Sequence, residues 1–102
     1  MRSGVRIDLD QQKILGFCRS HPIEKLWLFG SVLRADFGPE SDVDLLVEFE
    51  PGVRLSLWDV VEIQAGLSEL IGRPVDLVER SALRNPFRRR EILRTSRLLY
   101  AA

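Results

Sequence analysis

Two short sequence motifs, each at one end of an apolar run, have residue types and spacing suited to binding ions. Gly30 and Ser31 follow the nearly all apolar run 25–29, and Asp42-x-Asp44 opens the next one. Because side chains alternate along a strand, the two aspartates face the same way, about 7 Å apart, and can share a divalent cation. A Gly-Ser pair before a helical turn offers free backbone N–H groups to an anion. The two motifs together predict a cation site beside an anion site.

A third acidic residue is placed where it requires a partner. Asp76 lies between apolar neighbours in the short expected strand 75–78. A carboxylate there is costly unless it is paired, hydrogen-bonded or bound to a metal. We therefore include Asp76 among the candidate site residues.

The elements that must position these residues can be read from apolar periodicity and helix caps. We expect strands at 25–29, 42–49 and 75–78, with Val43, Leu45 and Val47 on the face opposite the first two aspartates. A first helix, 11–20, has Asp10 as its N-cap. The expected fold class is α/β (α+β), a small mixed sheet of at least three strands packed with helices.

Two further helices complete the expected fold. One starts after the N-cap Ser56, with Asp59 in the capping-box position, and ends near residue 71 before Gly72. Its expected buried side consists of Leu57, Val60, Val61, Leu67 and Ile71. The other starts at Asn85-Pro86 and is expected to continue to about Tyr100.

Length and composition limit the class of protein. The 102 residues, 45% hydrophobic, fit one small domain, 1–102, without room for a second substrate domain. Neither a membrane span nor a signal peptide is visible, so we expect a soluble cytoplasmic protein. His21 is the only histidine, which excludes a histidine cluster or triad. Cys18, in the apolar pattern of the first helix, is expected to be a buried structural thiol.

The charges are separated along the chain, although the formal net charge is zero. Residues 36–79 hold eleven acidic side chains and two arginines, whereas residues 80–102 hold seven arginines and one glutamate. This separation predicts a cation-attracting site beside a basic surface suited to phosphate or an acidic partner. The alternative interpretation of the basic run is a solvated helix face.

The combined motifs resemble a known superfamily. Gly30-Ser31, ten intervening residues, Asp42-x-Asp44 and a later strand with Asp76 are similar to the signature of the nucleotidyltransferases that include DNA polymerase beta and kanamycin nucleotidyltransferase. The small size is similar to that of the minimal nucleotidyltransferases (MNT proteins), many of which are antitoxins partnered with HEPN-domain toxins. The resemblance covers roughly residues 11–100 and implies the polymerase beta-like fold. The chain departs from larger relatives in lacking their C-terminal substrate-binding domain.

The resemblance also implies a reaction and roles for six residues: Asp42, Asp44, Asp76, Gly30, Ser31 and Arg34. The three aspartates would hold two Mg²⁺ ions, and Asp76 would also accept the proton of the attacking hydroxyl. The Gly-Ser pair and Arg34 would contact phosphates. The implied reaction is metal-dependent transfer of AMP from ATP to a hydroxyl, in MNT relatives a tyrosine of the toxin, which silences it.

Two other functions remain as alternatives. A catalytically silent antitoxin would neutralise its toxin by contact alone, and a polymerase or tRNA-modifying enzyme would use the basic tail. The complete set of aspartates and the Gly-Ser pair favour the enzyme, and the lack of a domain to grip a template argues against a nucleic-acid partner. We therefore expect ATP and a HEPN toxin as partners, and no membrane. Base preference and homo- or hetero-oligomeric state stay open.

Overall fold

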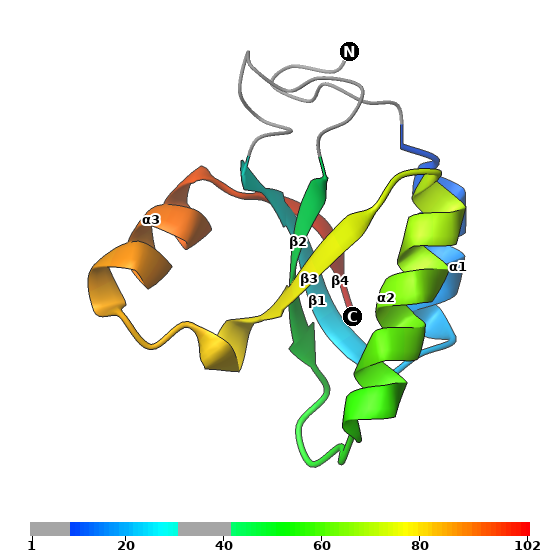
Figure 1. The fold of residues 1–102 in the computed structure, drawn as a ribbon, viewed down its shortest axis with the longest axis horizontal. Coiled ribbons are helices and arrows are strands. Elements are labelled where there is room, and N and C mark those ends of the chain that lie inside the picture. Colours follow the sequence, from blue (N-terminus) through cyan, green and yellow to red (C-terminus); the bar gives the residue numbers. More distant parts are fainter. Residues whose placement is uncertain (1–8, 31–41) are drawn as a thin grey trace.

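The structure, a computed structural model, describes residues 9–30 and 42–102. Its elements are, in chain order, α1 Gln11–Arg19, β1 Ile23–Phe29, β2 Val43–Phe49, α2 Leu57–Ile71, β3 Val75–Glu79, the 3-10 turn η2 Arg80–Ala82, α3 Pro86–Thr95 and β4 Arg97–Ala101. The strands form one sheet in the order β3-β2-β1-β4 (Figure 1). β2 and β3 are parallel, and the other neighbours are antiparallel. The predicted mixed sheet packed with helices is confirmed.

The predicted helix caps are present. The Asp10 side chain accepts hydrogen bonds from two backbone N–H groups in the first turn of α1. Ser56 and Asp59 form the reciprocal capping box at the start of α2. Gly72 ends α2 in the left-handed conformation, with φ of 81°. These caps satisfy backbone groups that a helix end leaves without partners.

The predicted buried side of α2 was partly wrong. Ile63 and Leu67 are the buried residues of this helix, whereas Leu57 and Val61 are 75% and 44% exposed. Residues two positions apart lie about 200° apart around a helix, so Val61 points away from the core that Ile63 enters. The true buried stripe therefore passes through residues 63 and 67.

The last predicted helix was too long. α3 ends at Thr95, and residues 97–101 form β4 along β1 instead of a continued helix. The Thr95 hydroxyl donates to the carbonyl of Glu91, and the Ser96 hydroxyl donates to that of Leu93, which satisfies late helix carbonyls. Tyr100 then enters the core opposite Leu26, which a helix continuing from α3 would not allow.

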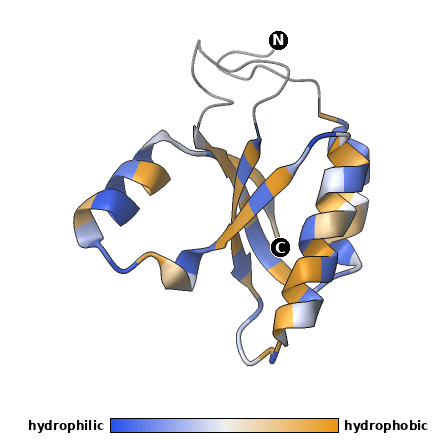
Figure 2. Cartoon of the chain, viewed as in Figure 1, coloured by the Kyte–Doolittle hydropathy of each residue, from blue (hydrophilic) through white to orange (hydrophobic). Residues whose placement is uncertain are grey.

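The two faces of the sheet differ. One face is covered by α1 and α2, and α3 lies on the other side (Figure 1). The covered face carries Leu26 and Leu28 of β1 and, as predicted, the three buried residues Val43, Leu45 and Val47 of β2. Successive side chains of a strand point to opposite faces, and polar residues stand among the hydrophobic ones along β2 and β3 (Figure 2). The polar residues between the core positions of β2 and β3 consequently face α3.

α2 also protects the edge strand β3. The Val75 N–H donates to the Ser68 hydroxyl, and the Leu77 N–H donates to the Gln64 side-chain oxygen, both at 3.0 Å. These bonds occupy donors that an edge strand otherwise presents to other chains. They also fix the strand that carries Asp76. No helix in the described part of the chain has both the length and the apolar character needed to cross a membrane.

Candidate active site

Three neighbouring strands place a row of residues across the face that α3 overlooks. Phe29 of β1 pairs with Asp44 of β2, and Asp44 pairs with Asp76 of β3. Directly paired residues on adjacent strands project to the same face and are close enough to interact. The parallel register of β2 and β3 therefore sets two predicted site carboxylates side by side, 32 residues apart in the sequence.

Gly30 lies next to this row, and its lack of a side chain leaves room for Asp44. It follows β1 with φ of 80°, in the left-handed region that favours glycine. The space where a Cβ would project from Gly30 is occupied by the carboxylate of Asp44. The glycine thus allows both the sharp turn after β1 and the close approach of Asp44 to the backbone.

These residues line one cavity between the sheet and α3, with a volume of about 670 Å³. The sheet side is formed by Phe29, Gly30, Asp44, Asp76 and Val78. The α3 side is formed by Arg88, Glu91, Ile92 and Thr95. The cavity therefore combines the two aspartates of the sheet, a backbone turn without a side chain, and the Arg88 guanidinium and Glu91 carboxylate of α3.

Asp42, the third predicted carboxylate, lies outside this cavity. It immediately precedes β2, where its side chain is exposed, and it is not part of the cavity lining. Within residues 9–30 and 42–102, no three His, Cys, Asp or Glu side chains are grouped closely enough to hold a metal ion. The structure therefore brings together two of the three predicted carboxylates. Ser31 and Arg34 lie outside the described residues.

The residues present nevertheless fit a magnesium ion. Mg²⁺ is usually held by one or two carboxylates together with substrate phosphates and water. Asp44 and Asp76 supply two carboxylates from directly paired positions, and the cavity beside them leaves room for a phosphate-bearing substrate. The donor set thus suits a metal ion that binds together with its substrate.

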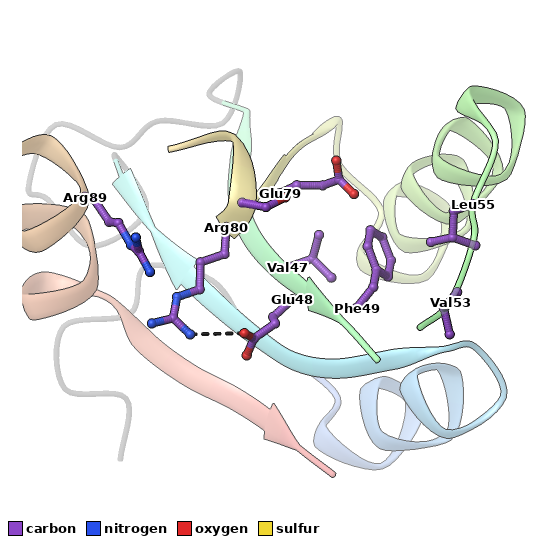
Figure 3. A pocket seen from close by; sticks show the side chains of 9 residues that line it. Val47, Glu48, Phe49, Val53, Leu55, Glu79, Arg80 and Arg89 are labelled. Carbon is purple, nitrogen blue, oxygen red and sulfur yellow. Dashed lines mark hydrogen bonds and ion pairs between the residues drawn. The ribbon is translucent and has the colours of Figure 1, made fainter. Parts of the chain in front are cut away.

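A second cavity, with a volume of about 500 Å³, is lined by the last residues of β2 and β3 and by the residues that follow them. Figure 3 shows that Arg80 and Arg89 both extend toward this space. Arg80 donates to the Glu48 carboxylate at 3.1 Å, and its guanidinium carbon is 5.8 Å from the Trp27 ring centroid. The Arg80 Nε is buried and has no hydrogen-bond partner among the described residues. The Arg80 guanidinium is thus held against the sheet by Glu48 and Trp27.

Cys18 has the predicted structural role. Its side chain has no exposed surface and belongs to the core formed by α1, α2 and the sheet. Burial raises the pKa of the Cys18 thiol from 9.0 to about 11. The thiol therefore stays protonated at neutral pH and is not a nucleophile.

Sequence reasoning did not resolve the α3 side of the cavity. The basic run 80–102 is predicted to meet phosphate or an acidic partner, and this prediction treats Arg88 and Arg89 alike, although only Arg88 lines this cavity. The spacing of residues 88, 91, 92 and 95 is that of one helix face and could have separated Arg88 from the rest. The sequence does not show which face of α3 is directed toward the sheet.

Comparison with known proteins identifies the family of the chain. The chain matches the family model described as nucleotidyltransferase domain over residues 11–99. It is 36% identical over 73 residues to a Methanocaldococcus jannaschii protein provisionally named a protein adenylyltransferase, covering 71% of each chain. It is 38% identical over 63 residues to the Thermococcus cleftensis protein adenylyltransferase MntA, covering 62% of each chain.

Solved structures share the fold. One, provisionally described as a minimal nucleotidyltransferase, is 35% identical, with a TM-score of 0.69 and 84% and 85% of the two chains covered. Another belongs to a complex of a tri-AMPylated Shewanella oneidensis HEPN toxin with an MNT antitoxin, at 19% identity, a TM-score of 0.62, and 90% and 70% coverage. Because the family model matches residues 11–99 and the relatives cover most of the chain, the chain belongs to the nucleotidyltransferase domain family.

Proposed function

We propose that this protein transfers AMP from ATP to a hydroxyl group of a cognate HEPN-domain toxin, a tyrosine in particular, and so acts as its antitoxin in the cytoplasm. The observation that carries the proposal is the meeting of Gly30, Asp44 and Asp76 in one cavity. Family membership supports nucleotidyl transfer, and the names of the relatives support a protein as the acceptor. The AMPylated HEPN toxin in the complex with a similar fold supports the identity of the partner.

The proposed site contains six residues: Asp42, Asp44, Asp76, Gly30, Ser31 and Arg34. Asp44 and Asp76 would hold Mg²⁺, with Asp42 joining them at the start of β2 for a second ion. The bound metal would supply positive charge that neutralises the triphosphate and the leaving pyrophosphate. Ser31, Arg34 and the backbone at Gly30 would hold the terminal phosphates.

The chain's own part in the reaction is orientation and proton transfer. Asp76 stands at an exposed position on the edge strand, where an incoming hydroxyl can reach it. One of its carboxylate oxygens would accept the hydroxyl proton as the oxygen attacks the α-phosphorus. The bond from the α-phosphorus to the bridging oxygen of the β-phosphate breaks, and pyrophosphate leaves. The products are AMP joined to the acceptor oxygen and free pyrophosphate.

Labelling of the partner tests this proposal. The protein is mixed with Mg²⁺, ATP labelled at the α-phosphate, and the protein encoded by its neighbouring gene. We expect transfer of label to the partner with release of pyrophosphate, and loss of both when Asp44 and Asp76 are replaced by Asn. Glu62→Gln, which removes an exposed carboxylate on α2, is the matched control and should label normally.

The contact-only antitoxin predicts a different result. In that case the wild-type protein protects cells from the toxin but never labels it, and the double Asp→Asn variant protects equally well. Either observation would replace transfer by simple binding as the function.

A further inference from the structure

α3 has two faces with different roles. Arg88, Glu91 and Ile92 lie on the face that lines the active-site cavity. The opposite face carries Arg89 and Arg90, which with Pro86, Leu93, Arg94 and the preceding Arg84 line a separate groove of about 570 Å³. Because successive helical residues turn by about 100°, the two sets lie on opposite sides of the helix. Arg88 is thus the arginine of α3 that lines the cavity containing Asp44 and Asp76.

Arg88 is also left without a charged partner. Its nearest acidic neighbour on the helix face is Glu91, one turn later, but the Glu91 carboxylate is bound by Arg94 at 2.8 Å. Among the described residues, the Arg88 guanidinium has no ion pair or hydrogen bond. The Arg88 backbone N–H donates to the Asn85 side chain at the start of α3, and this bond does not involve the guanidinium. Five guanidinium donors therefore remain available at the cavity wall.

The charges of the cavity identify the ligand that would use these donors. Asp44, Asp76 and Glu91 are its acidic described residues, and Arg88 is its cationic one. Asp44 and Asp76 would hold a metal ion, which would attract an anion, and the α3 wall with Arg88 would face that anion. A phosphate group matches a planar guanidinium because two of its oxygens can accept parallel hydrogen bonds.

We propose that Arg88 binds non-bridging phosphate oxygens of the nucleoside triphosphate from the α3 wall of the cavity, opposite the carboxylates. This inference rests on the proposed function, but it assigns a residue outside the Gly-Ser and Asp motifs. Arg88 holds the phosphate chain between α3 and the sheet. Arg89 and Arg90, on the other face of the helix, take no part in nucleotide binding.

Binding of Mg²⁺ and the non-hydrolysable ATP analogue AMP-PNP, measured by calorimetry, tests the assignment without catalysis. A charge-assisted hydrogen bond contributes about 1.5 to 3 kcal/mol, so Arg88→Gln should weaken binding by roughly tenfold to a hundredfold. Arg88→Lys should fall between this variant and the wild type, because it keeps the charge but loses the fork. Arg90→Gln, two positions away on the opposite face, is the matched control and should bind like the wild type. Thermal melts of all variants check that the fold is unchanged.

The outcomes separate this assignment from the proposed function. Equal AMP-PNP affinity of Arg88→Gln and Arg90→Gln overturns the assignment, and if labelling of the partner still falls for Arg88→Gln alone, the residue serves the acceptor. If the wild type binds AMP-PNP through Arg88 but never labels the partner, the assignment holds and the proposed function fails. If the wild type does not bind AMP-PNP at all, both fail.

Discussion

At the scale of single residues, the site depends on the contact between Gly30 and Asp44. The carboxylate lies where any larger residue at position 30 would place its Cβ. The backbone at Gly30 also has a φ of 80°, which residues other than glycine rarely adopt. Two separate physical requirements therefore select glycine at this position: the space filled by the Asp44 carboxylate and the left-handed backbone. The free-energy cost of the backbone strain can be measured apart from the cost of the clash with Asp44.

Gly30→Ala and Gly52→Ala separate these two requirements. Both glycines have φ near 80°, but nothing lies within 4 Å of a Cβ at Gly52. Both variants should lose about 1 to 2 kcal/mol of unfolding free energy from left-handed backbone strain. Gly30→Ala should lose more and should also bind Mg²⁺ and AMP-PNP poorly, because Asp44 is displaced. Denaturant unfolding and calorimetry measure the two effects, and equal binding by both variants would contradict the role of this contact.

Cys18 predicts a loss of stability at high pH. Its pKa is raised to about 11 by burial, so the folded state binds the thiol proton more tightly than the unfolded state. The resulting stability is fully present below pH 9 and is lost as pH rises toward 11. It amounts to about 2 to 3 kcal/mol for a shift of this size. Denaturant unfolding between pH 8 and 11 should show this loss in the wild type, and Cys18→Ala should lack it.

The rate of chemical modification of the Cys18 thiol tests its burial in a second way. At pH 8 a thiol-specific reagent should modify Cys18 only as fast as the protein unfolds, because the side chain has no exposed surface. Rapid modification of the folded protein would show that the core around α1 opens locally. It would also contradict the burial of Cys18 on which the predicted loss of stability at high pH depends.

At the scale of elements, α2 supports the site without touching it. Its Gln64 and Ser68 side chains accept hydrogen bonds from β3, which carries Asp76. They replace the missing neighbour strand at this edge of the sheet. The position of one site carboxylate thus depends on polar residues from the covered side of the sheet.

Gln64→Leu tests this support. The variant leaves the partly buried Leu77 N–H without its acceptor, which should cost about 1 to 3 kcal/mol of unfolding free energy. Glu69→Leu, an exposed change on the same helix, should stay within about 0.5 kcal/mol of the wild type. Thermal or denaturant unfolding compares them. A Gln64→Leu variant as stable as Glu69→Leu would show that water replaces the side-chain acceptor.

At the scale of the whole molecule, the sheet separates stability from chemistry. The face under α1 and α2 is a continuous apolar core, whereas the face toward α3 carries Asp44, Asp76 and the Glu48–Arg80 pair. α3 has no buried residue of its own. Substitutions on the α3 side should therefore change binding more than folding.

Magnesium should stabilise the folded protein through the carboxylates. A ligand that binds only the folded state raises the melting temperature with its concentration, and more so when AMP-PNP is present. Asp44→Asn and Asp76→Asn should remove most of this rise, and Asp42→Asn should reduce it if this residue joins the site. Melts with and without Mg²⁺ provide the measurement, with Glu62→Gln as the control. Equal metal shifts in all variants would show that the metal binds elsewhere.

The sequence by itself determined whatever depends on neighbouring residues. The caps at Asp10 and Ser56, the left-handed Gly72 and the alternating apolar positions of β2 all followed from local hydrogen bonding and side-chain periodicity. The motif spacing likewise indicated that Gly30 and Asp44 lie together. These signals require no knowledge of the distant chain.

Only the tertiary structure decided what depends on pairing between distant segments. Residues 97–101 became β4 because β1 offers them backbone partners and a core position for Tyr100, against a local pattern that also permits a helix. The parallel register joined Asp44 to Asp76 and left Asp42 exposed at the strand start. The packing side of α3 selected Arg88 from a run of arginines that are equivalent in sequence, because a helix can present only one face to the cavity.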